Sequence, residues 1–217
     1  MSEPTPQDVD DLLNRIVLGE DPTLEAALAA STAASLPPIE VTPQSAHLLG
    51  LLVQIAGARR VLEIGTLGGY STISLARAVG PEGSVVTLEY EPRHAEVAAA
   101  NLARARVADR VEIVVGAALD TLPTLSGAFD FVFIDADKEN NSAYVQWAID
   151  LGRPGTVIVV DNIVRNGRIL DPAADDTQAS AVRQMLEMMG RHPDLDTAAI
   201  QTVGGKGWDG FALAVVK

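Results

Sequence analysis

The sequence predicts an α/β protein whose mostly parallel sheet carries helices on both faces. Three observations support this fold class. From residue 60 onward, short apolar runs alternate with helical patterns, as in strands joined by right-handed crossovers. The runs are rich in β-branched residues, which is typical of strands buried on both faces. The last two runs, 197–203 and 211–216, have no helix between them, so we expect the terminal strand to be antiparallel.

The individual elements follow from local signals along the chain. Asp21-Pro22 separates two expected helices, and Thr42-Pro43 starts a third, because Thr is a good N-cap and Pro suits the first helical position. The polar segment 167–178 is expected to be a mobile surface loop. Helices are expected at 7–17, 23–35, 70–79, 92–106, 138–150 and 178–190, and strands at 60–64, 84–89, 111–115, 129–134 and 156–160.

Composition excludes several function classes. The net charge of −13 argues against a nucleic-acid partner and against an anionic membrane surface. The chain has no cysteine, so neither disulfides nor thiolate metal sites can form. No apolar run reaches membrane-spanning length, and the start of the chain does not resemble a signal peptide. We therefore expect a cytoplasmic protein with no membrane partner.

Carboxylates follow two of the predicted strands. Asp135 comes directly after the run Phe131–Ile134, and Asp161-Asn162 follows Val157–Val160. Ligands of parallel sheets bind at the carboxyl ends of the strands, so these side chains are expected to converge with Lys138 beside them. Three oxygen donors suit a hard cation, with Mg²⁺ as the first choice and Mn²⁺ or Ca²⁺ as alternatives. The competing interpretation is that Asp135 caps a helix and Lys138 is a solvated lysine in its first turn.

A glycine-rich turn after the first strand indicates a nucleoside site. Glycine permits positive φ and close backbone approach to a ligand, and three glycines fall between residues 65 and 69. Their spacing matches neither the dinucleotide fingerprint nor the lysine-containing phosphate loop. Glu63 could face a ligand ammonium group, and Glu89 suits a ribose diol because a carboxylate accepts two hydrogen bonds. A purely structural turn flanked by surface acids is the alternative.

Together these segments resemble the small cation-dependent O-methyltransferases of the catechol and caffeoyl-coenzyme A type, which use S-adenosylmethionine. The resemblance covers roughly residues 38–217 and is specific as a joint pattern. It implies a Rossmann-like class I methyltransferase fold with a seven-stranded sheet in a single domain, in which 1–40 is an amino-terminal helical extension and 41–217 the catalytic core. The segments that carry it are Val61–Thr66, Gly69–Ser71, Val85–Glu89, Val114–Ala118, Ile134–Lys138, and Arg153–Gly155 through Val160–Asn162.

The resemblance also implies which residues bind the cofactor. Glu63 and the backbone of Gly65 and Thr66 would hold the methionine part of S-adenosylmethionine. Ser71 would lie near the methionine carboxylate. Glu89 would bind the ribose hydroxyls.

Further roles follow from the same resemblance. Ala118 would lie by the adenine and Val41 by the methionine end of the cofactor. Asp135 would contact both the cofactor and the metal, and Lys138 would act as the base. The expected acceptor is a vicinal dihydroxy aromatic small molecule, and the protein is expected to form a homodimer.

Two positions depart from the family pattern. Many relatives have an aromatic residue three positions after the lysine and a tryptophan three positions after the metal asparagine; this chain has Asn141 and Arg165. Arg165 could meet an anionic group of the acceptor or a coenzyme A phosphate, or it could be a solvent-facing loop residue. Two other function classes stay open: a nicotinamide-dependent oxidoreductase and a non-catalytic nucleoside-binding protein on the same architecture.

Overall fold

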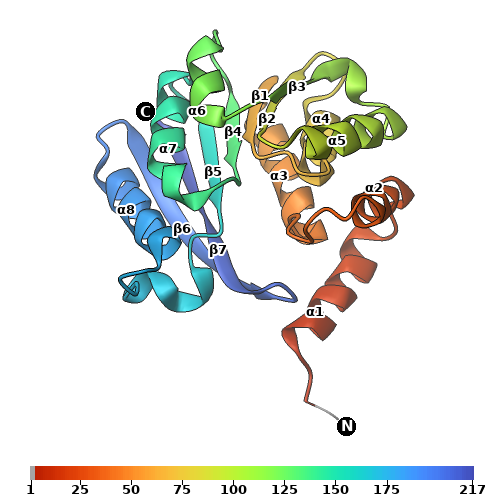
Figure 1. Cartoon of the computed structure of the whole chain (residues 1–217), viewed down its shortest axis with the longest axis horizontal. Helices are drawn as coiled ribbons and strands as arrows, with labels where there is room; N and C mark the ends of the chain where they lie inside the picture. Colours follow the sequence, from red (N-terminus) through yellow and green to blue (C-terminus); the bar gives the residue numbers. More distant parts are fainter. Residues whose placement is uncertain (1–2) are drawn as a thin grey trace.

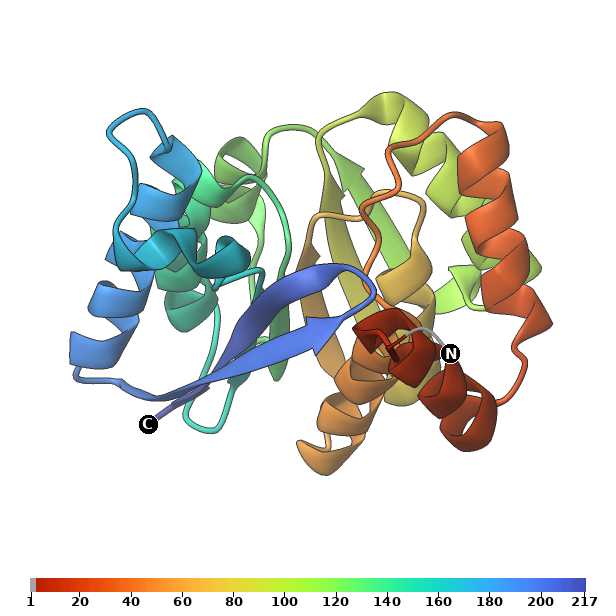
Figure 2. The same ribbon diagram turned by 90° about the horizontal axis from the view of Figure 1, so that it is seen from below.

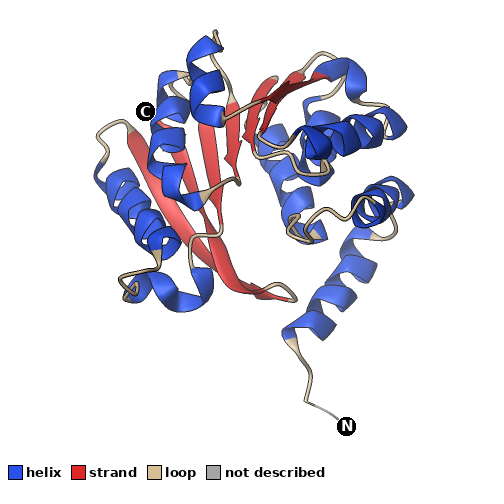
Figure 3. Ribbon diagram, viewed as in Figure 1, coloured by secondary structure: helices blue, strands red, loops and turns tan. Residues whose placement is uncertain are grey.

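The computed structural model describes residues 3–217 and contains a seven-stranded sheet with the order β3-β2-β1-β4-β5-β7-β6. Strands β1 to β5 run parallel, and β7 runs antiparallel to both of its neighbours (Figure 3). The predicted fold class is confirmed. The strands are β1 (Arg60–Ile64), β2 (Ser84–Glu89), β3 (Val111–Val115), β4 (Phe131–Ile134), β5 (Val157–Asp161), β6 (Leu195–Gly204) and β7 (Gly207–Val216).

Helices cover both faces of the sheet (Figure 1). One face carries α3 (Pro43–Ile55), α4 (Tyr70–Val79) and α5 (Pro92–Arg104), and α2 (Pro22–Ala33) packs outside α4 and α5. The other face carries α6 (Ala118–Thr121), α7 (Asn141–Asp150) and α8 (Thr177–Arg191). No helix within residues 3–217 is long and apolar enough to cross a membrane.

Alternating side chains divide the core into two clusters, one on each face. In β1, Val61 belongs to the cluster under α3, α4 and α5, whereas Leu62 belongs to the cluster under α7 and α8. Phe131 and Val132 of β4 divide in the same way, and all four side chains have no exposed surface. Burial on both faces explains why these strands read as continuous apolar runs in the sequence.

The first helix of the chain lies beside the tip of the β6–β7 hairpin (Figure 2). The helix α1 (Pro6–Leu13) continues into a π-helical turn at Asn14–Leu18. The Gly205 N–H donates to Asp10 Oδ2 at 2.7 Å, so the two ends of the chain are tied together. Exposed apolar side chains follow this helical arm: Val9, Leu12, Leu13, Ile16 and Val17. Homodimer formation and a cytoplasmic location stay predictions.

Some expected boundaries are wrong. The segment 167–178 is not a continuous loop, because Arg165–Leu170 forms 3-10 turns and α8 begins at Thr177 with Asp176 as its N-cap. The terminal strands are longer than expected and meet at a tight turn around Gly205-Lys206. The short α6 was not expected at all. Both hairpin strands contain glycines, which obscured their strand pattern in the sequence.

The chain changes direction across the sheet between β1 and β4, which are neighbours although they are not consecutive. Gly65 follows β1 and Asp135 follows β4, and the Asp135 N–H donates to the Ile64 carbonyl at 2.9 Å. A Cβ atom built on Gly65 would lie 2.1 Å from the Asp135 carbonyl oxygen, and Gly65 has φ +102°. Only glycine therefore fits at this switch point, where ligands of such sheets bind.

Replacing this glycine should destabilise the fold strongly. Gly65→Ala places a methyl group into backbone and adopts an unfavourable φ, so the free energy of unfolding should fall by about 3 kcal/mol or more. Gly57→Ala is the matched control, because Gly57 has φ +59° with no atom within 4 Å of the added Cβ. That variant should lose only about 1 kcal/mol in urea denaturation. Equal losses of unfolding free energy in the two variants would contradict the close approach of Gly65 to the Asp135 carbonyl.

Candidate active site

Glu63 lies in β1 with its carboxylate enclosed by hydroxyl groups. Ser71 Oγ donates to Glu63 Oε1 at 2.6 Å, and Thr72 Oγ1 and Thr87 Oγ1 donate to Glu63 Oε2 at 2.5 and 2.7 Å. The side chain is fully buried. Burial raises the pKa of Glu63 to about 7, although the three hydroxyl donors oppose the shift. The acid predicted to serve the methionine part therefore anchors the first turn of α4.

Glu89 ends β2 and faces the same glycine turn. Its Oε2 accepts from the backbone N–H groups of Thr66 at 3.1 Å and Leu67 at 2.7 Å. Its Oε1 accepts from the Glu91 N–H at 2.9 Å and lies 3.2 Å from His94 Nδ1. The predicted ribose acid and the predicted cofactor turn are thus brought into direct contact.

His94 of α5 also contacts Glu89, a contact that the sequence motifs did not predict. It lies one helical turn into α5, which begins at Pro92. A signal was available, because a residue five positions after a strand-ending acid can fold back onto it once a proline starts the next helix. His94 has no part in the predicted metal set.

The remaining cofactor candidates line the same edge of the sheet. Ala118 begins α6 directly after β3. Val41 is buried and precedes α3. It borders an apolar groove between α3 and the sheet, whose lining also includes Ser45, Leu49, Phe133, Val159, Asp161 and Phe211. Val41 and the predicted metal ligand Asp161 therefore share one groove.

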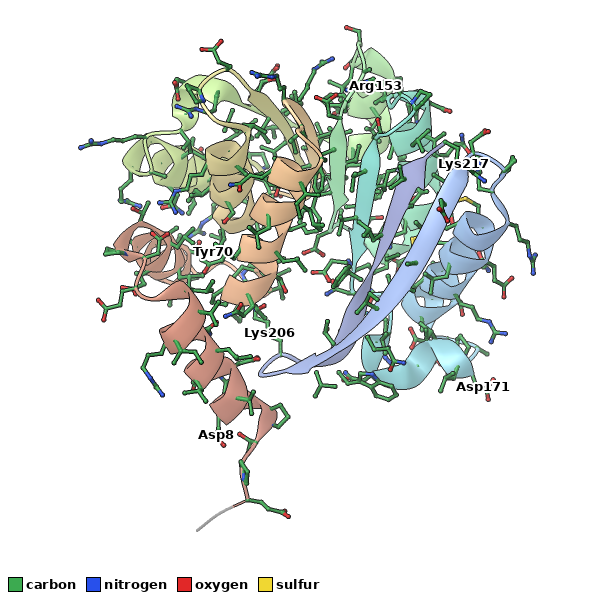
Figure 4. The ribbon with its side chains drawn as sticks, turned by 180° about the vertical axis from the view of Figure 1, so that it is seen from behind. Asp8, Tyr70, Arg153, Asp171, Lys206 and Lys217 are labelled. Atoms are coloured by element: carbon green, nitrogen blue, oxygen red, sulfur yellow. The ribbon has the colours of Figure 1, made fainter. Side chains whose placement is uncertain are left out.

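A second pocket also borders Val41. It is bordered by Tyr70 of α4, by Glu40 and by Lys206 at the hairpin tip (Figure 4). Lys206 Nζ donates to the Glu40 carbonyl oxygen and lies 3.2 Å from Glu40 Oε1. Burial and neighbouring acids raise the pKa of Tyr70 to about 12, so its hydroxyl stays protonated at neutral pH. The hairpin tip thus closes one side of the region next to Val41.

The predicted acidic cluster forms at the ends of β4 and β5. Lys138 Nζ lies 2.9 Å from Asp135 Oδ1 and 3.5 Å from the Asp161 carbonyl oxygen. Lys138 is only 6% exposed, so the interpretation as a solvated first-turn lysine is wrong. Burial raises the pKa of Asp161 to about 7, and the negative charge of Asp135 adds to the shift. Two carboxylates and one ammonium group therefore share a partly buried space.

Asn162 completes the predicted donor set in a left-handed conformation with φ +61°. Within residues 3–217 no three His, Cys, Asp or Glu side chains converge as a metal site. The candidate set is instead two carboxylates, Asp135 and Asp161, and one amide. Its oxygen donors, and the repulsion between Asp135 and Asp161 that Lys138 only partly offsets, fit a hard divalent cation.

Three buried side-chain atoms have no hydrogen-bond partner in the described part of the chain: Asn141 Oδ1, Asn141 Nδ2 and Arg165 Nε. These are the two positions that depart from the family pattern. Arg165 is not a free solvent-facing side chain, because its Nη2 donates to Gln178 Oε1 at 2.5 Å. Tyr144, the next aromatic residue, is buried, and its hydroxyl donates to Asp137 Oδ1.

The chain is similar to known proteins in both sequence and structure. The model of a family described as O-methyltransferase matches residues 17–214. A protein named catechol O-methyltransferase, from Mycobacterium tuberculosis, is 65% identical over 99% of this chain and 98% of its own length. A cofactor-bound crystal structure from the same species superposes with a TM-score of 0.97 at 65% identity over 99% of both chains. An O-methyltransferase from Bacillus cereus in complex with SAH gives 0.95 at 48% identity over 98% of both chains.

The architecture is the class I fold of S-adenosylmethionine-dependent methyltransferases. The chain belongs to the O-methyltransferase family.

The buried Glu63 should make stability fall as pH rises. Its pKa is about 7 in the folded protein against 4.5 ordinarily, so the folded state binds the proton more tightly. The cost of ionising it appears between about pH 4.5 and pH 7 and reaches on the order of 3 kcal/mol above that range. Glu63→Gln should remove this loss, so the difference in free energy of unfolding between variant and wild type should grow from pH 5 to pH 8. A difference that does not change with pH would show that burial does not raise the pKa of Glu63.

Proposed function

We propose that this enzyme transfers the methyl group of S-adenosylmethionine to one hydroxyl of a vicinal dihydroxy aromatic small molecule, assisted by a divalent cation. The observation that carries the proposal is the position of Asp135. Its backbone carbonyl lies against Gly65 of the glycine turn, and its carboxylate lies 2.9 Å from Lys138 Nζ. One residue therefore joins the predicted donor site to the charged, partly buried acceptor site.

S-adenosylmethionine is the methyl donor. The Bacillus cereus relative is bound to SAH, the demethylated form of that donor. In this chain Glu89 lies at one end of the glycine turn, and Ser71 with Glu63 lies at the other. A carboxylate offers about four acceptor positions, so Glu89 can accept from ribose hydroxyls in addition to the backbone of the turn.

Asp135, Asp161 and Asn162 are the residues that would hold the cation, with Mg²⁺ as the first choice. When bound, the cation would lower the pKa of an adjacent acceptor hydroxyl and stabilise negative charge on its oxygen. The raised pKa of Asp161 supports this assignment, because a positive charge between the two carboxylates would relieve their repulsion. The name of the M. tuberculosis relative supports a catechol as the acceptor class.

Lys138 acts as the base in its neutral amine form, so its ammonium must first lose a proton to solvent; Nζ then takes the proton from the acceptor hydroxyl. A free phenol has a pKa of about 10 and is mostly protonated at neutral pH, so a base is needed. The deprotonated oxygen attacks the methyl carbon in line, and the O–C bond forms as the C–S bond breaks. Asp135 Oδ1 holds Nζ in place, and the burial of Lys138 limits competing water. The products are a methyl ether and S-adenosylhomocysteine, without a covalent enzyme intermediate.

Removal of the cation should abolish methyl transfer without preventing S-adenosylmethionine from binding. With EDTA, S-adenosylmethionine should still bind in isothermal titration calorimetry, whereas catechol methylation should cease. Asp161→Ala should likewise abolish turnover and spare cofactor affinity, because Asp161 lies outside the glycine turn. Asp150→Ala, an exposed acid on α7, is the matched control and should be fully active. Undiminished activity after exhaustive metal removal would contradict the proposed mechanism.

Replacing the proposed base, Lys138, should lower kcat most at low pH. Lys138→Ala should reduce kcat by about 10²-fold at pH 6. The deficit should shrink above pH 9, where the acceptor loses its proton to solvent. A pH–rate profile of catechol methylation measures this, with Lys217→Ala as the control for a lysine far from the cluster. A small deficit that does not vary with pH would remove Lys138 from the role of base.

A further inference from the structure

The turn that follows β5 carries the predicted metal ligands in a strained backbone. Asn162 has φ +61°, Arg165 φ +55°, Asn166 φ +54° and Gly167 φ +79°. Asparagine tolerates this left-handed region, whereas at Arg165 it costs of order 1 kcal/mol or more and persists only where the surroundings impose it. Some contact outside the turn must therefore hold residues 162–167 in place.

Asp209 of β7 provides that contact. Its Oδ1 accepts from the Val164 N–H at 2.9 Å and from the Arg165 N–H at 3.1 Å. One carboxylate oxygen thus binds two consecutive donors of the strained turn. Asp209 is distant in sequence but adjacent in the sheet, because β7 pairs with β5 up to the register Asp161 with Phe211.

Neighbouring contacts fix the same turn from the same strand. The Ile163 N–H donates to the Gly210 carbonyl at 3.1 Å. The Trp208 N–H donates to Asn166 Oδ1 at 3.3 Å, and the indole ring packs against Gly167. Backbone contacts such as that of Gly210 do not depend on the side chain. Asp209 is therefore the side chain whose removal frees two turn amides at once.

We propose that Asp209 is a positioning residue that holds the turn after β5 so that Asp161 and Asn162 present their oxygens to the cation. The inference rests on the proposed function for the identity of the ligand. Asp209 acts as a hydrogen-bond acceptor in this role, so an amide oxygen at the same position can replace it. The negative charge of Asp209 has a separate effect, because it contributes to the raised pKa of Asp161.

The test compares Asp209→Ala, which removes the acceptor, with Asp209→Asn, which keeps an acceptor oxygen and removes the charge. The first readout is the Kd of Mn²⁺ by electron paramagnetic resonance with S-adenosylmethionine bound. Loss of a residue that supports a metal ligand typically costs 10- to 100-fold in affinity. We expect Asp209→Ala to raise the Kd at least about tenfold and Asp209→Asn to stay within about threefold of wild type. Asp196→Ala, an exposed acid on β6, should leave the Kd unchanged.

The second readout is hydrogen exchange of the Val164 and Arg165 amides in the metal-free full-length protein. Both amides should exchange at least about tenfold faster in Asp209→Ala than in wild type or Asp209→Asn, because a lost hydrogen bond exposes them to solvent. If Asp209→Ala does not fold, Asp209→Ser takes its place in both measurements. Its shorter side chain does not span the same distance.

The outcomes distinguish the positioning role of Asp209 from the metal part of the proposed function. Wild-type Mn²⁺ affinity or unchanged amide exchange in Asp209→Ala overturns the positioning role. Equal weakening in Asp209→Asn and Asp209→Ala also overturns it, because charge and not hydrogen bonding would then act on the cation. If the wild-type protein binds no Mn²⁺, the metal part of the proposed function fails, whereas amide exchange still decides whether Asp209 holds the turn.

Discussion

The close approach of Gly65 to the Asp135 carbonyl is the contact on which the rest of the site depends. The parallel strands β1 and β4 are neighbours whose following segments leave toward opposite faces of the sheet. In open α/β sheets, ligands bind at the point where the connections diverge in this way. The absence of a side chain at Gly65 lets the glycine turn lie directly against the end of β4. The predicted cofactor turn and the acidic cluster, which are distant in sequence, are thereby neighbours.

The charged groups at this edge of the sheet then determine which chemistry the site can support. Asp135 and Asp161 share a space from which water is partly excluded, and Lys138 supplies the positive charge beside them. A buried group of this kind is costly unless further positive charge is added. This arrangement supports the proposed roles of Asp135 and Asp161 as metal ligands and of Lys138 as the base. Three hydroxyl donors contact the buried carboxylate of Glu63, but its pKa is still raised to about 7, so they offset only part of the cost of burial.

Much of this site could be predicted from sequence because its residues stand next to regular strands. Asp135 and Asp161 lie at the ends of buried runs, and parallel strands bring such ends to one edge. The contribution of β7 could not be predicted, because Asp209 lies in a glycine-rich segment without a clear strand pattern. His94 was missed for a related reason, since its contact with Glu89 depends on where α5 begins. The surroundings of Asn141 and Arg165 could not be predicted either, because buried atoms of both side chains have no hydrogen-bond partner within residues 3–217.

The most direct test of the account compares methyl transfer from labelled S-adenosylmethionine to catechol and to phenol, with and without Mg²⁺. Catechol offers two adjacent oxygens to a cation held by Asp135, Asp161 and Asn162, whereas phenol offers one. The account predicts methylation of catechol only with Mg²⁺, and methylation of phenol slower by at least about 10²-fold, consistent with the loss of an oriented contact. Phenol methylation at the rate of catechol, or catechol methylation unaffected by Mg²⁺, would contradict it.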